Sequence, residues 1–276
     1  MKKIIIIFLY LILFPVASSN PEDPEEVRQF FLKVFENNLS GIAVSDYVNG
    51  AMIRSADALE QFESIMDFPP FQGDIELGKA IWETPLPSGA TYADCLPNRG
   101  VNIAGHYPIF DEQSKKLISF EMLINDCLEK NGGIAYSFDD RKTMGALTAY
   151  ARKLSDGMSM DIKVESEGAL QKFEAGRAFY FKRIGQHNLA CASCHLTHGG
   201  KYFRDELVSP TIGQPVHFPV FRAGERLYTL HMRYQRCMEA VGAIPFAAGS
   251  EELNSLEYFH SYLSNGLPLR ASVYRR

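Results

Sequence analysis

The five residues Cys191-Ala192-Ser193-Cys194-His195 constrain this chain more than any other feature of its sequence. The spacing C-x-x-C-H is the attachment sequence of a c-type haem. Its two thiols form thioethers with the two vinyl groups of one haem, and the adjacent histidine ligates the iron. A thioredoxin-like redox pair and half of a zinc site are the alternatives. The chain lacks the strand-helix-strand surroundings of the former and a second paired-ligand motif for the latter, so we expect one covalently bound haem c.

The N-terminus has the pattern of an export signal. Lys2 and Lys3 precede an unbroken apolar stretch at 4–14, and the small residues at 16–19 offer a cleavage site. The apolar stretch is shorter than the ~20 residues of a membrane-spanning helix, although a retained anchor is the alternative. We therefore expect residues 1–19 to be a signal peptide. The mature protein should then be periplasmic, with no membrane span.

Composition excludes several classes of protein. The chain has 276 residues, of which 46% are hydrophobic and 22% are charged, which is typical of a globular protein with one large or two small domains. Its 28 Lys and Arg against 33 Asp and Glu argue against a nucleic-acid binder. Between residues 201 and 236, however, six basic side chains stand against three acidic ones. Such a local excess suits a small anion or an acidic partner.

Hydrophobic periodicity predicts a mainly α fold. Apolar residues recur at three- and four-residue intervals in 25–61, 142–154 and 251–263, and few stretches alternate apolar and polar residues. The cluster Phe68 to Gly73 is rich in turn residues and predicts a boundary. A second boundary is expected near 160–167.

A short internal repeat divides the chain into two halves. The segment Gly176-Arg177-Ala178-Phe179-Tyr180 is similar to the earlier segment Gly78-Lys79-Ala80-Ile81-Trp82. Each precedes one cysteine and is followed later by another: Cys191 and Cys237 in one half, Cys95 and Cys127 in the other. We interpret the two halves as related, the alternative being a coincidence between two amphipathic helices.

The first half lacks the haem motif. If Cys95 corresponds to Cys191, then Asn98 and Arg99 occupy the positions of the second cysteine and the histidine. The repeat offers Cys127 as a disulfide partner for Cys95, and that bond would stabilise the fold by roughly 3–4 kcal/mol. Two separate buried thiols are the alternative.

The fifth cysteine, Cys237, is left without a partner. It lies in a segment that can form a helix, with Arg233 four residues earlier on the same face. Beside a ferric haem and an arginine, a thiolate at Cys237 would be favoured, and it could bind iron or react with sulfur. An inert buried thiol is the alternative. The rival sixth ligands of the iron are Met232, Met238, His198, His217 and His231.

Taken together, these residues resemble the SoxA family, the larger subunit of the c-type cytochrome of the bacterial sulfur-oxidising (Sox) system. The resemblance runs from about Phe71 to the C-terminus. It includes Cys95, the segments 106–111 and 120–127, the haem motif with Gly199-Gly200, and Arg233-x-Gln235-x-Cys237.

The periodicity and the first boundary predict an N-terminal helical extension at 20–70. With the second boundary, the resemblance implies a cytochrome c-like domain without haem at 71–160 and a cytochrome c-like domain with the catalytic haem at 161–276. It implies covalent haem on Cys191 and Cys194 and axial iron ligands at His195 and Cys237. Cys237 would be the catalytic residue, carried as a persulfide, and Arg233 would bind substrate. The departure at Asn98 and Arg99 is similar to monohaem members with a Cys95–Cys127 disulfide.

The resemblance also implies an activity, L-cysteine S-thiosulfotransferase. In that reaction thiosulfate is conjugated oxidatively to a cysteine of the SoxYZ carrier protein, and electrons pass to cytochrome c. The implied partners are a SoxX-type small cytochrome c subunit, in a heterodimer, and SoxYZ. The alternatives are a periplasmic electron-transfer cytochrome c with no chemistry of its own and a dehydrogenase that turns free thiosulfate into tetrathionate.

Overall fold

A computed structural model describes residues 23–203, 206–222 and 227–275 of the chain. The predicted signal peptide lies outside these residues, as do four charged residues of the basic stretch, at 204, 205, 225 and 226. The fold is mainly helical, as predicted. Within the described ranges, no helix has both the length and the apolar character needed to cross a membrane.

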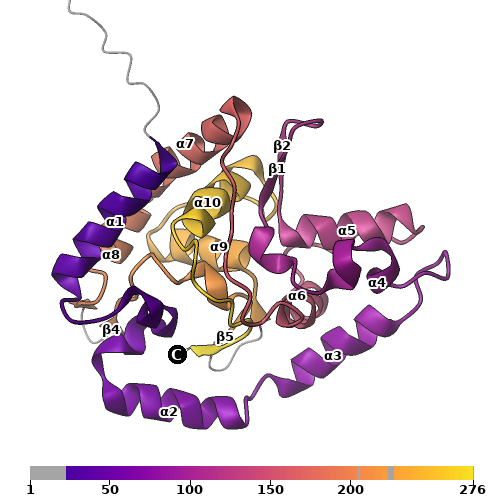
Figure 1. Cartoon of the computed structure of the whole chain (residues 1–276), viewed down its shortest axis with the longest axis horizontal. Helices are drawn as coiled ribbons and strands as arrows, with labels where there is room; N and C mark the ends of the chain where they lie inside the picture. Colours follow the sequence, from indigo (N-terminus) through magenta and orange to yellow (C-terminus); the bar gives the residue numbers. More distant parts are fainter. Residues whose placement is uncertain (1–22, 204–205, 223–226, 276) are drawn as a thin grey trace, which may run out of the picture.

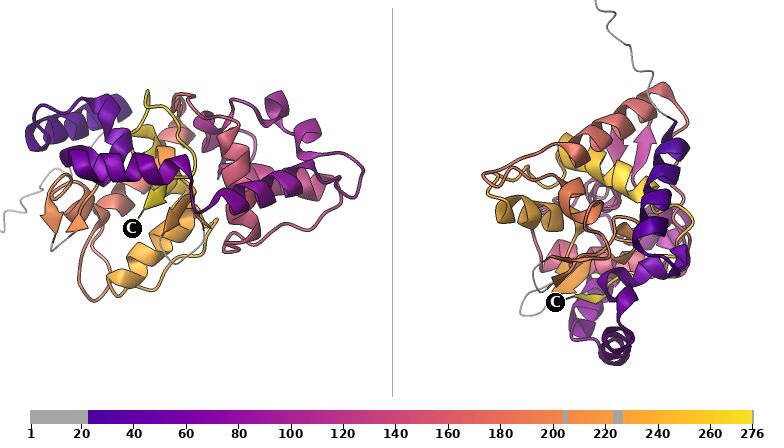
Figure 2. Two further views of the ribbon diagram at one scale, coloured as in Figure 1. Left: turned by 90° about the horizontal axis from the view of Figure 1, so that it is seen from below. Right: turned by 90° about the vertical axis from the view of Figure 1, so that its left-hand side faces the viewer.

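An N-terminal extension precedes the two halves. It consists of α1 (Pro24–Asn38), the 3-10 helix η1 (Val44–Arg54) and α2 (Ala56–Asp67). In Figures 1 and 2 the extension, in indigo and violet, lies against the orange and yellow C-terminal half rather than the magenta half. Phe31 of α1 packs with its ring centroid 5.7 Å from Tyr180 and 5.9 Å from Phe259, which anchors α1 to the C-terminal half.

The rest of the chain consists of two repeats with the same order of α-helices, each with a hairpin before its third helix, and the second repeat has an additional short hairpin. The first repeat contains α3 (Gln72–Glu83), α4 (Tyr92–Cys95), η2 (Pro97–Gly100), η3 (Ala104–His106), β1 (Ile109–Asp111), β2 (Lys116–Ile118), α5 (Phe120–Lys130) and α6 (Thr143–Lys153). The second repeat contains α7 (Glu167–Phe181), α8 (Cys191–His195), β3 (Tyr202–Phe203), β4 (Glu206–Leu207), η4 (Pro215–His217), β5 (Val220–Arg222), β6 (Leu227–Tyr228), α9 (Leu230–Ala240) and α10 (Glu251–Tyr262). The helices predicted at 142–154 and 251–263 are confirmed as α6 and α10.

The two repeats pack their long helices in the same way. Gly78 of α3 lies so close to α6 that a Cβ atom would collide with the carbonyl oxygen of Ala146. Gly176 of α7 lies against α10 in the same manner, and its Cβ would collide with the carbonyl oxygen of Ser255. Both contacts require glycine, which explains why the glycine of the sequence repeat occurs in both halves. The predicted relation between the halves is confirmed.

The helices α5 and α9 also correspond residue by residue. Each has 11 residues, and each follows a short antiparallel hairpin, β1–β2 or β5–β6. Each is capped by a hydroxyl group: the Oγ of Ser119 accepts from the backbone N–H of Met122 at 3.2 Å, and the Oγ1 of Thr229 accepts from that of Met232 at 3.4 Å. Cys127 and Cys237 are both the eighth residue of their helix.

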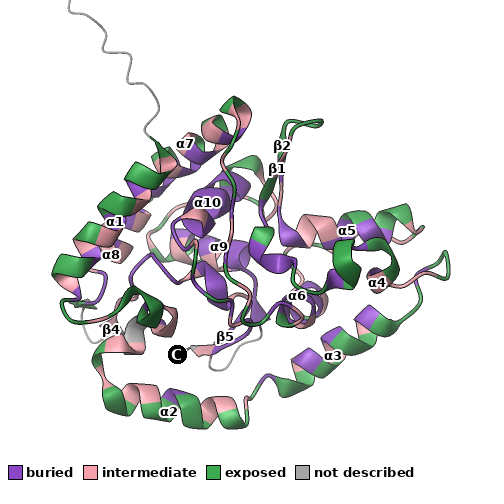
Figure 3. Ribbon diagram, in the orientation of Figure 1, coloured by how far each residue is buried: buried purple, intermediate pink, exposed green. Residues whose placement is uncertain are grey.

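The C-terminal segment joins the parts together. Strand β7 (Tyr274–Arg275) pairs in parallel with β5. The backbone N–H of Ala271 donates to Asp156 at 2.7 Å, and the guanidinium of Arg152 in α6 donates to the carbonyl oxygen of Pro215 at 3.3 Å. Helix α10 is mostly buried and α9 partly so, and both lie between the extension and the first repeat (Figure 3). The domain limits at 70 and 160 stay predictions.

Candidate functional site

The haem motif forms a single helical turn. Helix α8 begins at Cys191 and ends at His195, and the Oγ of Ser193 accepts from the backbone N–H of Ala190 at 3.1 Å, which fixes the start of the turn. Residues three apart lie on the same face of a helix, so Cys191 and Cys194 point to one side. This is the arrangement that two thioether bonds to one porphyrin need.

His195 is held with one ring nitrogen available to a metal. Its Nδ1 lies 3.0 Å from the carbonyl oxygen of Ser209, and the side-chain amide of Gln214 lies 2.8 Å from the same nitrogen. Both of these polar contacts are made by Nδ1, which leaves Nε2 as the ring nitrogen that would ligate a metal. Such a second hydrogen bond is the usual way in which a protein orients a ligating histidine.

Helix α9 brings Cys237 to face His195. Burial would raise the pKa of the Cys237 thiol, but a hydrogen bond with the His195 side chain and the charge of Arg233 outweigh it. Arg222 of β5 acts in the same direction, so the pKa of Cys237 lies below its usual value. The structure therefore brings together three of the predicted site residues, and it adds Arg222, whose role the sequence did not reveal.

Cys191 and Cys194 lie at the same place. Burial, followed by the charge of Cys237, raises the pKa of the Cys191 thiol to about 12, and the same two causes raise the pKa of Cys194. Two thiols for the porphyrin, one imidazole and one further sulfur thus lie close together. This donor set fits a covalently attached haem with histidine and cysteine as axial ligands.

Two of the rival sixth ligands, His231 and His198, make other polar contacts, and the remaining three are buried. The Nδ1 of His231 accepts from the backbone N–H of Gly249 at 2.9 Å, and its Nε2 lies 3.0 Å from a carboxylate oxygen of Glu257. The Nδ1 of His198 lies 2.7 Å from the carbonyl oxygen of Ser193. Met232 belongs to a cluster with Phe62, while Met238 and His217 are buried, Met238 within the main core.

The first repeat uses the corresponding positions differently. Cys95 and Cys127 are joined in a disulfide with Cα atoms 5.9 Å apart. Helix α4 is capped by Thr91, whose N–H donates to Asp94 at 2.8 Å, just as Ala190 donates to Ser193 before α8. The caps align Cys95 with Cys194.

The alignment of Cys95 with Cys191 in the sequence analysis is therefore wrong by three residues. Tyr92, not Cys95, corresponds to Cys191, and Leu96 corresponds to His195. Asn98 and Arg99 lie beyond the motif, in η2 with positive φ angles of 47° and 56°. The physical reason is that the capping box at Thr91 and Asp94 sets where the helix starts. With tyrosine and leucine at these positions, the turn offers neither a second thioether nor a proximal imidazole.

Comparison with known proteins identifies relatives of this chain. A family model described as SoxA/TsdA, cytochrome c domain, matches residues 77–160. The L-cysteine S-thiosulfotransferase subunit SoxA of Chlorobaculum tepidum is 37% identical over 256 residues, which cover 92% of this chain and 87% of the relative. The subunit of the same name from Allochromatium vinosum is 34% identical, with 95% and 94% covered. The chain belongs to the SoxA family.

A solved structure agrees with this assignment. The crystal structure of SoxXA from P. pantotrophus matches with a TM-score of 0.71 and 25% identity, covering 79% of this chain and 84% of that one. The SoxA/TsdA cytochrome c model falls on the first repeat, so that repeat keeps a cytochrome c fold although its turn lacks the haem motif. Membership of this cytochrome family implies a haem c cofactor, and Cys191, Cys194 and His195 are the residues that would hold it.

Proposed function

We propose that this SoxA family member is the haem-bearing subunit of an L-cysteine S-thiosulfotransferase. It would conjugate thiosulfate oxidatively to a cysteine of a carrier protein. The observation that carries this proposal is the position of Cys237, which faces His195 and has Arg233 one helical turn away. The names of the relatives, L-cysteine S-thiosulfotransferase subunit SoxA, support the same reaction.

Arg233 and Cys237 have different roles toward thiosulfate in this proposal. The planar guanidinium of Arg233 presents several N–H donors and suits the anionic sulfonate end. The Cys237 sulfur would then meet the sulfane sulfur, and the charge of Arg233, which acts to lower the pKa of this thiol, favours the reactive thiolate. The positive charge of Arg222 adds to the attraction for a doubly charged anion.

The overall reaction balances with a two-electron acceptor. A carrier thiol and thiosulfate form a sulfur–sulfur bond, giving the S-thiosulfonate, one proton and two electrons. Haem, when bound, supplies the one-electron path to an external cytochrome c. The residues of this chain bind the anion at Arg233, hold the reacting sulfur at Cys237 and orient His195 through Ser209.

We further propose that the protein carries one haem c, bound through Cys191 and Cys194 with His195 and Cys237 as axial ligands. The disulfide at Cys95 and the residues Tyr92 and Leu96 support a single haem, since the first repeat has no free cysteine pair for a second. An export signal at residues 1–19 supports a periplasmic location, where disulfides persist and haem c is attached.

The proposed partners are a small SoxX-type cytochrome subunit, in a heterodimer, and the SoxYZ carrier. The structural neighbour is a SoxXA complex, which supports the first of these. The activity named for the relatives, L-cysteine S-thiosulfotransferase, supports a cysteine as the acceptor.

The test combines mass spectrometry with one substitution. Purified haem-loaded protein, its cytochrome subunit, carrier, thiosulfate and oxidised cytochrome c are mixed, and the intact mass of the carrier is followed. We expect the carrier to gain one thiosulfonate, and Cys237→Ala to abolish this gain while haem stays attached. Normal conjugation by that variant would overturn the proposal. Thiosulfate-dependent formation of tetrathionate with an unmodified carrier would favour the dehydrogenase instead, and no thiosulfate chemistry at all would favour a plain electron carrier.

A further inference from the structure

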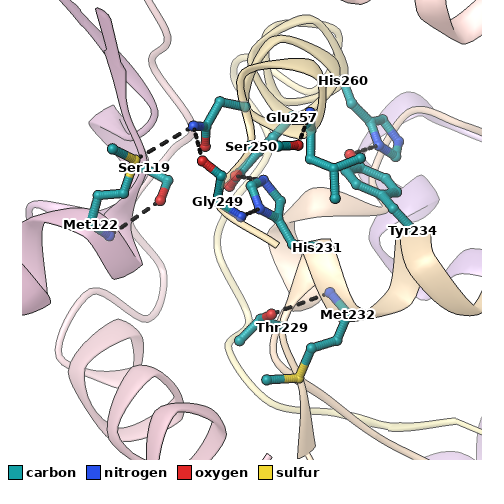
Figure 4. Close-up of polar contacts among 12 residues, drawn as sticks. Ser119, Met122, Thr229, His231, Met232, Tyr234, Gly249, Ser250, Glu257 and His260 are labelled. Carbon is teal, nitrogen blue, oxygen red and sulfur yellow. Dashed lines mark hydrogen bonds and ion pairs between the residues drawn. The ribbon is translucent and has the colours of Figure 1, made fainter. Parts of the chain in front are cut away.

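A chain of hydrogen bonds connects helix α9 with the haem motif. The hydroxyl of Tyr234 lies 2.8 Å from Nδ1 of His260, and Nε2 of His260 lies 3.1 Å from the carbonyl oxygen of Thr211. Figure 4 shows the first of these bonds, between α9 and α10. Thr211 then donates to the carbonyl oxygen of His195, from its N–H at 3.2 Å and from its Oγ1 at 3.1 Å.

The chain allows one arrangement of its hydrogens. Because the Thr211 carbonyl can only accept, Nε2 of His260 must carry the hydrogen. In the neutral ring Nδ1 is then the acceptor, and the Tyr234 hydroxyl must donate to it. All three side chains are buried, with 8%, 4% and 0% of Tyr234, His260 and Thr211 exposed, so water does not compete for these bonds. The result is a link with a fixed direction from α9 to His195.

The first repeat shows that the fold does not need this link. Tyr234 is the fifth residue of α9, and the fifth residue of α5 is Ile124. The glycine contacts align Tyr150 with Phe259, so Ala151 stands where His260 does. Ile124 and Ala151 are both fully buried. The same helices therefore pack with apolar side chains at these two positions when no haem motif is present.

We propose that Tyr234 and His260 are positioning residues, which hold α9 against α8 and so fix the position of Cys237 relative to His195. Tyr234 and Cys237 are three residues apart on one helix, hence on the same face, and a displacement at one moves the other. This inference rests on the axial ligands of the proposed function and goes beyond it, since that proposal gives neither residue a role in binding substrate or iron.

The test compares four variants by electron paramagnetic resonance of the ferric haem. For the wild type we expect one low-spin species with cysteine ligation. Tyr234→Phe and His260→Leu should each convert a substantial fraction to a second species without cysteine ligation. His260→Gln should keep the wild-type spectrum, because an amide also offers one donor and one acceptor. Tyr228→Phe is the matched control, since this tyrosine is fully buried and its hydroxyl has no hydrogen-bond partner among the described residues.

Two further comparisons keep the outcomes distinct. The double variant Tyr234→Phe/His260→Leu should show no larger effect than the stronger single variant, because the two residues act as one link. Cys237→Ala, with haem content checked by intact mass, gives the reference spectrum without cysteine ligation. If Cys237→Ala changes the spectrum and neither Tyr234→Phe nor His260→Leu does, the positioning role is overturned alone. If Cys237→Ala changes nothing either, the axial ligand of the proposed function is wrong, and the inference fails with it.

Discussion

The two repeats surround the same position with the same helices and use it in opposite ways. In the first, Cys95 of α4 and Cys127 of α5 form a disulfide. In the second, the corresponding Cys194 and Cys237 are free thiols, and Cys237 faces His195. The comparison teaches that one pair of positions can close a helix pair covalently or leave it open for a cofactor, without a change in how the helices pack.

The first repeat also fills its centre with aromatic rings. Tyr92, at the position of Cys191, stacks on Trp82 with ring centroids 5.4 Å apart, and Tyr150 makes an edge contact with Trp82 at 6.0 Å. Tyr92 is fully buried and Trp82 is 5% exposed. Aromatic side chains bury large areas, so they can replace the apolar surface that a porphyrin supplies. In the first repeat the disulfide and these rings together take over the stabilising role of haem.

Removing the Cys95–Cys127 disulfide and removing Cys237 give the largest expected effects, and these effects differ in kind. Cys95→Ala/Cys127→Ala should lower the free energy of unfolding by about 3–4 kcal/mol, because it releases the loop closed across 32 residues. The rate of thiosulfate conjugation per folded molecule of this variant should stay unchanged. Cys237→Ala should lower the conjugation rate by at least about 1000-fold and hardly change stability. Denaturant unfolding measures the free energy of unfolding, and the intact mass of the carrier measures the conjugation rate. If the two variants changed stability equally and conjugation equally, the proposed difference between the repeats would be wrong.

Arg233→Leu tests the substrate side of the comparison. Leucine is the residue that the first repeat has at this position, Leu123, so the substitution fits the helix. We expect the apparent affinity for thiosulfate to fall about 30-fold, which corresponds to about 2 kcal/mol for hydrogen bonds to a charged group. Haem content should be unchanged. Arg236→Leu, an exposed neighbour paired with Glu239 at 2.6 Å, is the control. An equal loss from both variants would show that overall charge, not Arg233, recruits the anion.

The amides at the sixth position of α5 and α9 test what the repeats share. The side chain of Asn125 donates to the carbonyl oxygen of Tyr136 at 2.9 Å and accepts from its N–H at 3.0 Å. Gln235 donates to the carbonyl oxygen of Phe246 at 3.1 Å. Asn125→Leu removes two hydrogen bonds and should cost about 2 kcal/mol of stability. Gln235→Leu removes one and should cost about 1 kcal/mol.

Because both bonds hold the loop after a helix, neither substitution should alter the haem spectrum, in contrast to Tyr234→Phe. Denaturant unfolding and the visible spectrum of each variant are the measurements. A spectral change with Gln235→Leu alone would show that this amide serves the site rather than the fold.

The sequence predicts the parts of this molecule that depend on local spacing. The C-x-x-C-H turn, Arg233 and Cys237 one turn apart, and the helices α6 and α10 all follow from periodicities within a few residues. The alignment of Cys95 with Cys191 was wrong because it rested on the cysteines alone. The capping box at Thr91 and Asp94, which is visible in the sequence, indicates the correct start of the helix.

Longer-range features carried no such signal. The link from Tyr234 to His260 joins residues 26 apart, and the link from His260 to Thr211 joins residues 49 apart. No local pattern marks a buried tyrosine and histidine as partners, and the apolar residues that replace them in the first repeat are recognised only once the helices are superposed. Arg222 was missed for the same reason, since it reaches Cys237 from a separate strand.

The smallest expected effect concerns the extension, which covers the second repeat. Arg270, after α10, binds both carboxylate oxygens of Glu63 in α2, at 3.1 and 2.9 Å, and its guanidinium lies 4.9 Å from the ring centroid of Phe62. The hydrogen bond from Arg270 holds the pKa of Glu63 below its usual value. Since the side chain of Glu63 is half exposed, Glu63→Gln should cost less than about 1 kcal/mol at pH 7.

The sign of the pH dependence follows from the lowered pKa. A carboxyl group whose pKa is lower in the folded state stabilises the protein above its unfolded value, roughly 4.3, and the contribution is lost as the pH falls through the folded value. The stability difference between wild type and Glu63→Gln should therefore be constant near neutrality and disappear in acid. Glu60→Gln, on the exposed side of the same helix, is the matched control for denaturant unfolding at both pH values. A difference that persists in acid would mean that Glu63 acts through packing on the second repeat and not through its charge.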